Sequence, residues 1–510
     1  MLGNSIWSEN GNYTYDNSSS LLVNNYYNIN AIGGVPLLNQ ANAVIRQVAY
    51  FADASITYKG WATLEGTLRN DRDSRLPASN QSFYYPSVKA VFIPTDAIPG
   101  LKNNEVLDYW KLYADLSRVG QISAPPYSSN SYNVTTGFPY SSLGALTVNS
   151  TYYPPDLKPE IISETEFGTE LGLFKDRLHL TADYYYQKSR NQTLDVNISP
   201  STGYTNTLIN AGEVDSYGGE FSAQAIIIPK GPNNVGWTVG GNFAINDSKV
   251  VSLLPGVDKL QISQEDNING QNVGGVFAVV GQSYPQLYTT DYARDPQGHV
   301  IVNPGNGIPE SNPNLVDQGR TTPKYNLGLN TSVNYKFITL NIVADYRAGN
   351  VVYNEIGSAM DFSGSSASSA AAGRQIFVYP GSVVNTGTAA APVYAPNTTP
   401  VFKGGWEYWS TYPVNVGSPY VTSAAFWEIR EVSLAFNLNQ FVKNSKYIKG
   451  LTFALTGRNL FLFLPKSEQW GDPELSDVAS GGNGINAIGA ITTNQLPSPR
   501  IYGADLQVTF

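Results

Sequence analysis

The feature that most constrains this chain is an alternation of apolar and polar residues that returns along its length. In "RLHLTADYYYQ", residues 177–187, every second position is apolar or aromatic, namely Leu178, Leu180, Ala182, Tyr184 and Tyr186. Because successive side chains of a strand point to opposite faces, this pattern predicts a β-strand with one apolar and one polar face. The pattern recurs in 237–246 and 325–335, while long amphipathic helical patterns are scarce. The predicted fold class is all-β.

The last eleven residues, "RIYGADLQVTF", narrow the choice among all-β folds. One face of this segment carries Tyr502, Ala504, Leu506, Val508 and Phe510. A soluble protein would have to cover this face and protect the strand edge, whereas lipid covers such a face directly. Tyrosines near strand ends suit a membrane–water interface, and polar opposite faces suit a wet lumen, so we predict a transmembrane antiparallel β-barrel. A secreted or surface β-sandwich, acting as an adhesin or glycan-binding protein, also alternates and remains the alternative.

Short turns and four long connections separate the predicted strands. The long connections span about 121–159, 251–322, 351–422 and 464–499. Outer-membrane barrels show this asymmetry, with short periplasmic turns and long extracellular loops. We predict about thirteen strands, near 46–59, 60–71, 81–94, 107–120, 159–174, 177–198, 205–229, 234–250, 323–335, 337–350, 424–437, 450–462 and 500–510.

The number of strands bears on how the sheet closes. With short turns on the periplasmic side, both the first and the last predicted strand run toward the periplasm. Because neighbouring strands alternate in direction, the total number of predicted strands is odd. Bacterial barrels close with an even number of antiparallel strands. The chain is therefore expected to be the C-terminal part of a larger barrel, residues 46–510, preceded by a residual extracellular loop segment, residues 1–45. The start "MLGNSIWSEN" lacks the basic and apolar regions of a signal peptide, which agrees with that expectation.

Composition excludes several classes of function. The 510 residues include no cysteine and two histidines, His179 and His299, so thiolate sites and a histidine-based metal cluster are not expected. A net charge of −9 argues against a nucleic-acid partner, which would need a basic surface. No stretch approaches the roughly 18 apolar residues of a membrane helix. No catalytic set, metal or cofactor is predicted, and the protein is not expected to be an enzyme.

Aromatic residues of the long connections are candidates for contact with a substrate. They lie in "KGGWEYWSTYPVN" and "SAPPYSSNSYN", and they are Trp406, Tyr408, Trp409, Tyr412, Tyr127 and Tyr132. Trp and Tyr are common binding anchors. Packing of loops, or a place in the interface girdle, is the more common role in a chain with 34 tyrosines.

Polar residues of the strands are expected to face the lumen. A charge on the lipid face costs about 2–4 kcal/mol at the bilayer midplane, so charged strand residues belong inside. The expected lumen-facing residues are Arg69, Asp183, Asn330, Asn334, Asp345, Arg347 and Arg458. The carboxylates of "RNDRDSR" and "GDPE" lack the spacing of a calcium loop and are predicted to be solvated loop charges.

An ordered set of motifs resembles one known family. The segments include "LKPEIISETEFGTELGLFKDRLHLTADYYYQKSRNQ", "ISPSTGYTNTLINAGEVDSYGGEF", "TLRNDRDSRLP", "SFYYPSVKAVF", "FWEIREVSLAFNL", "LTFALTGRNLFLF", "GDPE" and "LPSPRIYGADLQVTF". From about Val48 to Phe510 they resemble, in the right order, the barrel region of SusC/RagA-type TonB-dependent outer-membrane transporters. The resemblance implies a 22-stranded barrel, of which this chain supplies about thirteen strands without the plug, the TonB box and the early strands.

The resemblance also implies a function, partners and a location. The function would be TonB-dependent import of a large nutrient, a glycan or a peptide, across the cell outer membrane. A SusD-type surface lipoprotein would act as a lid, and TonB would engage through the plug region. The face formed by Tyr502, Leu506, Val508 and Phe510 resembles the terminal-strand signal that the barrel insertion machinery reads.

Overall fold

The protein was analysed as a computed structural model. It describes residues 1–17, 20–28, 31–33, 37–102, 105–123, 130, 132–135, 145–231, 235–312, 314–371, 373–401, 406–475, 477–478, 488–493, 496 and 498–510. The chain divides into two compact units. The first comprises Met1–Phe92, Tyr113–Glu166 and Gln187–Glu213, and the second Ile93–Leu112, Phe167–Tyr186 and Val214–Phe510.

One large sheet dominates the described part of the chain, and it confirms the all-β, antiparallel prediction. Fifteen strands belong to it, and hydrogen bonding joins fourteen of them in the order of the sequence. These fourteen are β1 Leu2–Asn17, β4 Leu37–Tyr58, β5 Ala62–Asp73, β6 Ser82–Phe92, β7 Leu107–Gln121, β11 Glu160–Leu173, β12 Leu178–Asn197, β13 Asn206–Ile228, β14 Val235–Ser252, β19 Tyr325–Tyr335, β20 Ile338–Ala348, β27 Phe426–Asn437, β28 Gly450–Phe463 and β31 Ile501–Thr509. The fifteenth, β10 Thr151–Tyr152, pairs with β13. Among the described residues β1 and β31 are the two ends of this path, so the sheet is not closed.

The register of the first unit shows why its sequence forms strands. Leu64 lies opposite Ile56 of β4 and Ala90 of β6, and the neighbouring Glu65 lies opposite Ser55 and Lys89. Apolar and polar residues are therefore separated on the two faces, as the alternation predicts. Lys59 and Gly60, between β4 and β5, both have positive φ, of 49° and 81°. Such a pair is what a two-residue hairpin turn requires.

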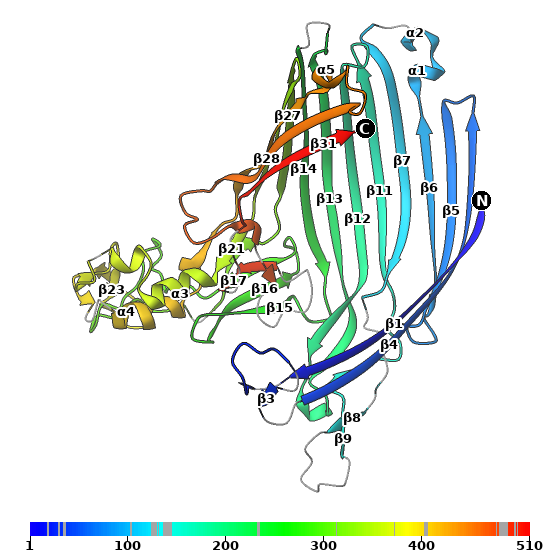
Figure 1. Ribbon diagram of the computed structural model, residues 1–510. Coiled ribbons are helices and arrows are strands. Elements are labelled where there is room, and N and C mark those ends of the chain that lie inside the picture. Colours follow the sequence, from blue (N-terminus) through cyan, green and yellow to red (C-terminus); the bar gives the residue numbers. More distant parts are fainter. Residues whose placement is uncertain are drawn as a thin grey trace. The chain divides into compact units, whose positions relative to one another are not determined.

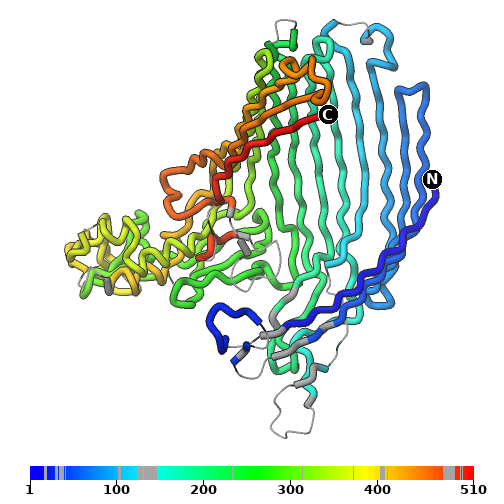
Figure 2. Tube along the Cα trace, in the orientation of Figure 1, coloured from blue at the N-terminus to red at the C-terminus, as the bar shows by residue number. Residues whose placement is uncertain are grey.

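The structure corrects the interpretation of residues 1–45 as a loop. Strand β1 pairs antiparallel with β4 over sixteen residues, from Leu2 opposite Ala52 to Asn17 opposite Leu37 (Figure 2). This strand was missed because Ile6 and Trp7 are adjacent and are flanked by Asn, Ser and Glu, so residues 2–10 show no alternation of apolar and polar side chains. Among the described residues the sheet path has fourteen strands where about thirteen were predicted, so the odd count is not confirmed.

In the second unit, the connections after β14, β20 and β28 build small sheets and helices at one end of these strands (Figure 1). The sheets are β15 Lys259–Asp266, β16 Asn272–Val279, β17 Gln286–Thr289 and β18 Val316–Arg320, and then β26 Val421–Ser423, β21 Val351–Asn354, β30 Ile488–Ile491 and β29 Asp477–Val478. Two-stranded pairs are β22 Phe377–Val378 with β25 Pro400–Val401, and β23 Val383–Asn385 with β24 Tyr394–Pro396. The helices here are α3 Glu355–Ser363, α4 Trp406–Thr411, η3 Ser368–Ala370, η4 Pro413–Asn415, η5 Ser418–Tyr420 and η6 Pro473–Leu475.

The remaining described elements are short. Between strands of the main sheet lie α1 Pro94–Ala97, α2 Pro99–Lys102, α5 Asn439–Val442 and η2 Pro200–Thr202. Two further strand pairs are β2 Ser20–Leu21 with β3 Ile32–Gly33, and β8 Tyr132–Thr135 with β9 Ala145–Val148. Among the described residues, no helix is long and apolar enough to cross a membrane.

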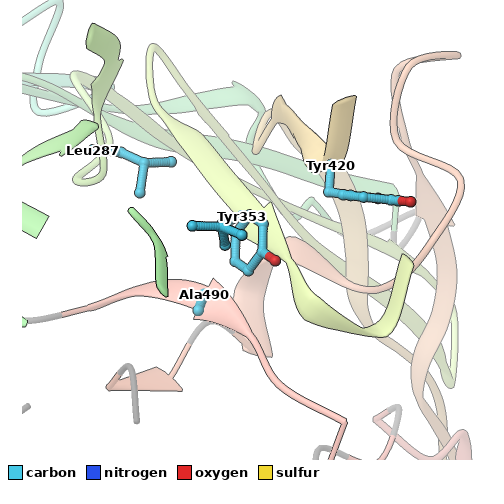
Figure 3. Packing of buried hydrophobic residues seen from close by; sticks show 5 residues of the cluster. Leu287, Tyr353, Tyr420 and Ala490 are labelled. Carbon is cyan, nitrogen blue, oxygen red and sulfur yellow. The ribbon is translucent and has the colours of Figure 1, made fainter. Parts of the chain in front are cut away.

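A buried core holds the elements of the long connections together. Val273, Leu287, Tyr353, Tyr420 and Ala490 form one cluster, drawn from β16, β17, β21, η5 and β30 (Figure 3). Each is almost fully buried. In the view of Figure 3 the Tyr420 hydroxyl points away from Tyr353. Its apolar ring thus belongs to this core, while its polar end serves a neighbouring cavity.

The two faces of β31 should respond differently to a charge. Leu506 lies opposite Phe453 on the apolar face, and the adjacent Gln507 lies opposite Thr452 on the polar face. We expect Leu506→Arg to lower the free energy of unfolding of the chain in lipid vesicles by about 2–4 kcal/mol, because the predicted barrel turns this apolar face toward lipid. Chemical denaturation followed by heat-modifiable gel migration measures this change. Gln507→Arg is the matched control, and equal losses in both variants would contradict the assignment of faces.

Candidate binding site in the long connections

A cavity of about 470 Å³ lies among the helices and short strands of the second unit. Its wall is built from separate stretches of the chain that the fold brings together. The lining residues are Tyr292, Asp361, Ser368, Ala371, Phe377, Val378, Tyr379, Pro380, Tyr408, Trp409, Pro413, Pro419, Tyr420, Gln469 and Trp470. Volume and composition match a small-molecule site, which is mostly apolar and aromatic with a few polar groups.

Edge-to-face contacts fix the aromatic wall. The Tyr408 ring lies 5.4 Å from Phe377 and 5.3 Å from Trp409, in both cases nearly perpendicular. Tyr292 and Tyr379 make a similar contact at 6.1 Å on another part of the wall. Aromatic pairs favour this geometry because the positive edge of one ring meets the negative face of the other. Tyr408 is buried, whereas Trp409 is half-buried and accessible from the cavity.

Asp361 supplies the carboxylate of the cavity. It lies in the last turn of α3 and is 4% exposed. Its Oδ2 accepts a hydrogen bond from the Tyr420 hydroxyl at 2.8 Å, and its Oδ1 accepts from the hydroxyls of Ser366 and Ser368. Three neutral donors therefore orient this carboxylate.

The cavity hydroxyls remain protonated at neutral pH. Burial raises the pKa of Tyr292 and of Tyr408 well above the ordinary tyrosine value. Burial, followed by the nearby charge of Asp361, raises the pKa of Tyr420 as well. The hydroxyl of Tyr420 therefore acts as a donor toward Asp361 rather than as a phenolate.

The segment around Trp470 closes another side of the cavity. Glu468 is buried and accepts hydrogen bonds from the backbone amides of Trp470 and Gly471, at 2.8 and 3.1 Å, and from the Asn354 side chain at 3.2 Å. Gly357 in α3 lets the indole of Trp470 approach, because a Cβ there would lie 2.9 Å from the ring. Helix α3 and the Trp470 segment are thus packed in direct contact.

An ionic cluster ties the same segment to the main sheet. Arg430, the extra residue of a bulge in β27, binds Asp345 of β20 through Nε and Nη2, at 2.7 and 2.8 Å. It also binds Glu428 and Glu474, and Arg347 reaches Glu474 at 3.1 Å. Two cations therefore meet three carboxylates, and Glu474 anchors η6 to the polar face of the sheet.

The prediction of solvated carboxylates in "RNDRDSR" and "GDPE" is wrong. Asp71 and Asp73 are buried, and they pair with Arg69 at 2.7 Å and with Arg75 at 2.8 Å. Asp472 is also buried, and Glu474 belongs to the ionic cluster. Each carboxylate has a cationic or backbone donor that lies two or more positions away, which sequence spacing alone did not reveal.

The structure separates the predicted loop aromatics. Tyr408 and Trp409 line the cavity, and Tyr412 lies beside Tyr408 without lining it. Trp406 is the first residue of α4, and its side chain is outside the described residues, as is all of Tyr127. Tyr132, in β8, is 68% exposed.

The polar strand residues lie on the face opposite the apolar one. Asn330 lies opposite Gly240 and Asn334 opposite Gly236, while Asp345 and Arg347 join the ionic cluster. Arg458 pairs with Glu431 at 3.0 Å and Arg69 with Asp71; Asp183 lies on β12. On β31, Tyr502, Leu506 and Val508 share one face with Leu455 and Phe453 across the β28 pairing, and Phe510 follows the strand. That the polar face borders a lumen remains a prediction.

Sequence reasoning missed most of the cavity. Asp361, Tyr420 and Trp470 are far apart in the chain and belong to no motif. Within the low-complexity run "SGSSASSAAAG", residues 363–373, Ser366 and Ser369 are buried, and the Ser366 hydroxyl donates a hydrogen bond to Asp361. A carboxylate two residues before a serine-rich run is a pattern consistent with serine hydroxyls that donate hydrogen bonds to that carboxylate.

A second depression and the two histidines offer fewer groups that could bind a ligand. A depression of about 800 Å³ follows the apolar face of β12, β13, β14 and β19, and side chains such as Phe221 and Leu329 give it almost no polar groups to orient a ligand. His179 pairs with Asp176 and His299 with Asp295. Within the described ranges, no group of three or more histidine and carboxylate side chains is arranged to hold a metal ion.

Comparison with known proteins places these observations in a family context. A family model described as TonB dependent receptor-like, beta-barrel, matches residues 2–460. TonB-dependent receptor P26 of Formosa agariphila is 25% identical over 487 residues, which cover 91% of this chain and 46% of that protein. TonB-dependent receptor P3 of the same organism is 22% identical over 494 residues, covering 91% and 45%. The chain spans about half the length of these curated relatives.

Solved structures give the same picture of the fold. The RagAB peptide transporter superposes with a TM-score of 0.71 at 18% identity, and the match covers 100% of this chain and 53% of that one. The RagAB peptide importer in the "closed-closed" state gives 0.70 at 18% identity, with the same coverage. At this identity the similarity establishes the fold.

Breaking the ionic cluster should release the loop segment that it anchors. We expect Glu474→Gln to lower the free energy of unfolding by about 1–3 kcal/mol, because Arg430 and Arg347 lose a charged acceptor in a partly buried site. Limited proteolysis should then cut faster within residues 464–499. Glu431→Gln breaks only the more exposed pair with Arg458, worth about 0–1 kcal/mol, and serves as the control. Equal protease resistance of Glu474→Gln and the unmodified chain would rule out the anchor.

Glu265 should make stability depend on pH. Its side chain is buried in β15, and burial, with smaller contributions from Glu355 and Asp266, raises its pKa well above 4.5. The folded chain then holds a proton that the unfolded chain releases, so this residue lowers stability as pH rises above about 4.5. We expect Glu265→Gln to raise the thermal midpoint at pH 7.5 and to leave it nearly unchanged at pH 4. Melting curves at both values test this, and a variant less stable at pH 7.5 would contradict it.

Proposed function

This chain belongs to the TonB dependent receptor-like, beta-barrel family, and we propose that it forms the C-terminal barrel wall and substrate-contacting loops of an outer-membrane nutrient importer. The cargo is a large nutrient, an oligosaccharide or a peptide. The observation that carries this proposal is the aromatic cavity built by the long connections at one end of β14, β20 and β28. A substrate would contact a site at that position before it entered the lumen.

The exposed apolar face supports a membrane setting over a β-sandwich. In a sandwich the apolar faces of two sheets cover each other. Here large apolar side chains in the middle of strands remain open, with Leu64 at 56%, Val88 at 48% and Leu506 at 66% exposure. Lipid is the cover that suits such a face, and the family is one of outer-membrane receptors.

The partners follow from the same proposal. A SusD-type surface lipoprotein closes over the long connections as a lid, and TonB supplies the energy for import through a plug region. The barrel insertion machinery recognises the apolar face of β31, which includes Tyr502, Leu506 and Val508. The RagAB structures are those of a peptide importer, which makes peptides one of the two cargo classes to test first.

Import can be tested in cells that produce the complete transporter. Outer membranes are isolated, and uptake of labelled oligosaccharides and peptides is measured with and without functional TonB. The proposal predicts a heat-modifiable band in the outer-membrane fraction and uptake that stops without TonB. A product that partitions as a soluble protein would contradict the import proposal.

The cavity should contribute to apparent affinity for the cargo. We expect Trp409→Ala to raise the half-saturating concentration of uptake several-fold, since one aromatic contact contributes on the order of 1 kcal/mol. Tyr412→Ala is the matched control, because Tyr412 lies on the same stretch of chain but does not line the cavity. Uptake kinetics at equal amounts of transporter in the membrane measure both. Equal effects would remove the cavity from the substrate path.

A further inference from the structure

We propose that the aromatic cavity around Asp361 binds an organic cation, a primary amine or guanidinium carried on an apolar or aromatic body. This inference deepens the proposed function, on which it rests for the role of the ligand as cargo. Binding itself requires neither TonB nor a lid. The inference comes from a charge that the fold buries without a countercharge, in a cavity with aromatic walls.

The charge balance of the cavity is the first argument. Asp361 is the only charged side chain among the described residues that line the cavity. Its hydrogen-bond partners among the described residues are the hydroxyls of Ser366, Ser368 and Tyr420, and none of the ion pairs between described residues includes Asp361. A carboxylate removed from water is stabilised far more by a cation than by neutral donors. Asp73 and Glu428, which are also buried, each pair with an arginine, whereas the buried Glu265 and Glu468 have no described ion pair and do not line this cavity.

The position of Asp361 in its helix is a second reason to expect a bound cation. It lies in the last turn of α3, where the aligned peptide dipoles give the helix end a partial negative charge. Backbone amides cap the carbonyls of Met360 and Asp361, and the Arg374 guanidinium donates to the carbonyl of Gly364 just beyond the helix, but the last turn itself holds no basic residue. A cation bound at Asp361 would therefore interact favourably with both the carboxylate and the helix end.

The hydrogen-bonding capacity of Asp361 leaves room for a ligand. An ionised carboxylate offers about four acceptor positions, and the three hydroxyl donors fill three of them. Among the described residues, Oδ2 accepts from the Tyr420 hydroxyl alone, which leaves one acceptor position for a ligand. The three hydroxyls also fix the orientation of the carboxylate, which reduces the entropy lost on binding.

The walls suit a cation attached to an apolar body. Rings of Trp409, Tyr379 and Phe377 line the cavity, and the faces of such rings attract cations, with tryptophan the strongest. Apart from Asp361 and the hydroxyls, Gln469 is the main polar group of the wall. A neutral sugar would bring many hydroxyl groups that this wall could not satisfy. An amine with an aromatic or aliphatic body matches one charge and many apolar contacts.

Phenethylamine and 2-phenylethanol test the inference as a matched pair of probes. They share a ring and a chain, and only the amine is charged at pH 7.5. Binding to the whole 510-residue chain in detergent is followed by calorimetry and by tryptophan fluorescence, to which Trp409 and Trp470 contribute. We expect the amine to bind roughly tenfold to a hundredfold more tightly than the alcohol, as for a charged hydrogen bond.

Asp361→Asn keeps the shape and removes the charge. It should abolish the preference for the amine while leaving the weak binding of the alcohol. Glu310→Gln removes an exposed carboxylate of the neighbouring connection and should keep the preference. Equal binding of the two probes to the unmodified chain, or an unchanged preference in Asp361→Asn, would overturn the inference.

A folding defect in Asp361→Asn does not leave the question open, because the comparison of probes on the unmodified chain decides it. Trp409→Leu gives a second reading, since it removes one ring from the wall and keeps the carboxylate. It should weaken both probes and retain the preference for the amine. Loss of binding selectivity with normal TonB-dependent uptake would reject the cation site alone. Selective binding without uptake would reject the import proposal alone.

Discussion

Pairing of backbone amides and carbonyls between neighbouring strands is the constraint on which the rest of this structure depends. In an apolar surrounding every such group needs a partner, and an antiparallel sheet supplies one for each residue of its inner strands. Side chains are then divided between two faces by the pleat alone. The apolar face, with Leu64, Val88 and Leu506, needs no protein cover in lipid, and the polar face holds Arg430 and its carboxylates. Both the family's membrane setting and the position of the cavity follow from this division.

The long connections depend on the sheet without sharing its pattern. They form a core of their own around Tyr353 and Tyr420, and two carboxylates hold the Trp470 segment in place. Glu468 binds backbone amides next to Trp470, and Glu474 binds Arg430 on the sheet. The main sheet therefore positions the loops that carry the residues of the cavity. This arrangement explains how aromatic residues from distant parts of the chain keep one cavity of about 470 Å³ open.

The success and failure of prediction differ by element. The main-sheet strands from β5 to β31 were predictable because alternation is local and each hairpin follows from its neighbours. Strand β1 was missed because Asn, Ser and Glu interrupt its apolar positions, although it pairs with β4 over sixteen residues. In the cavity, Tyr408 and Trp409 were found as an aromatic cluster in the sequence. Asp361 was not, because the hydroxyl of Tyr420 that identifies it lies 59 positions away.

Residue patterns in the chain were sufficient to predict the all-β fold, the two unlike faces of its strands and the family resemblance. These properties depend on residue spacing over a few positions, which a chain carries before it folds. Tertiary structure alone decided that β1 joins the sheet, that Arg430 binds Glu474, and that Asp361 is buried beside aromatic rings. Those contacts join residues that are tens to hundreds of positions apart in loops without a repeating pattern. Packing of the core around Tyr353 decides which of these side chains come into contact. Local sequence patterns therefore do not predict these contacts.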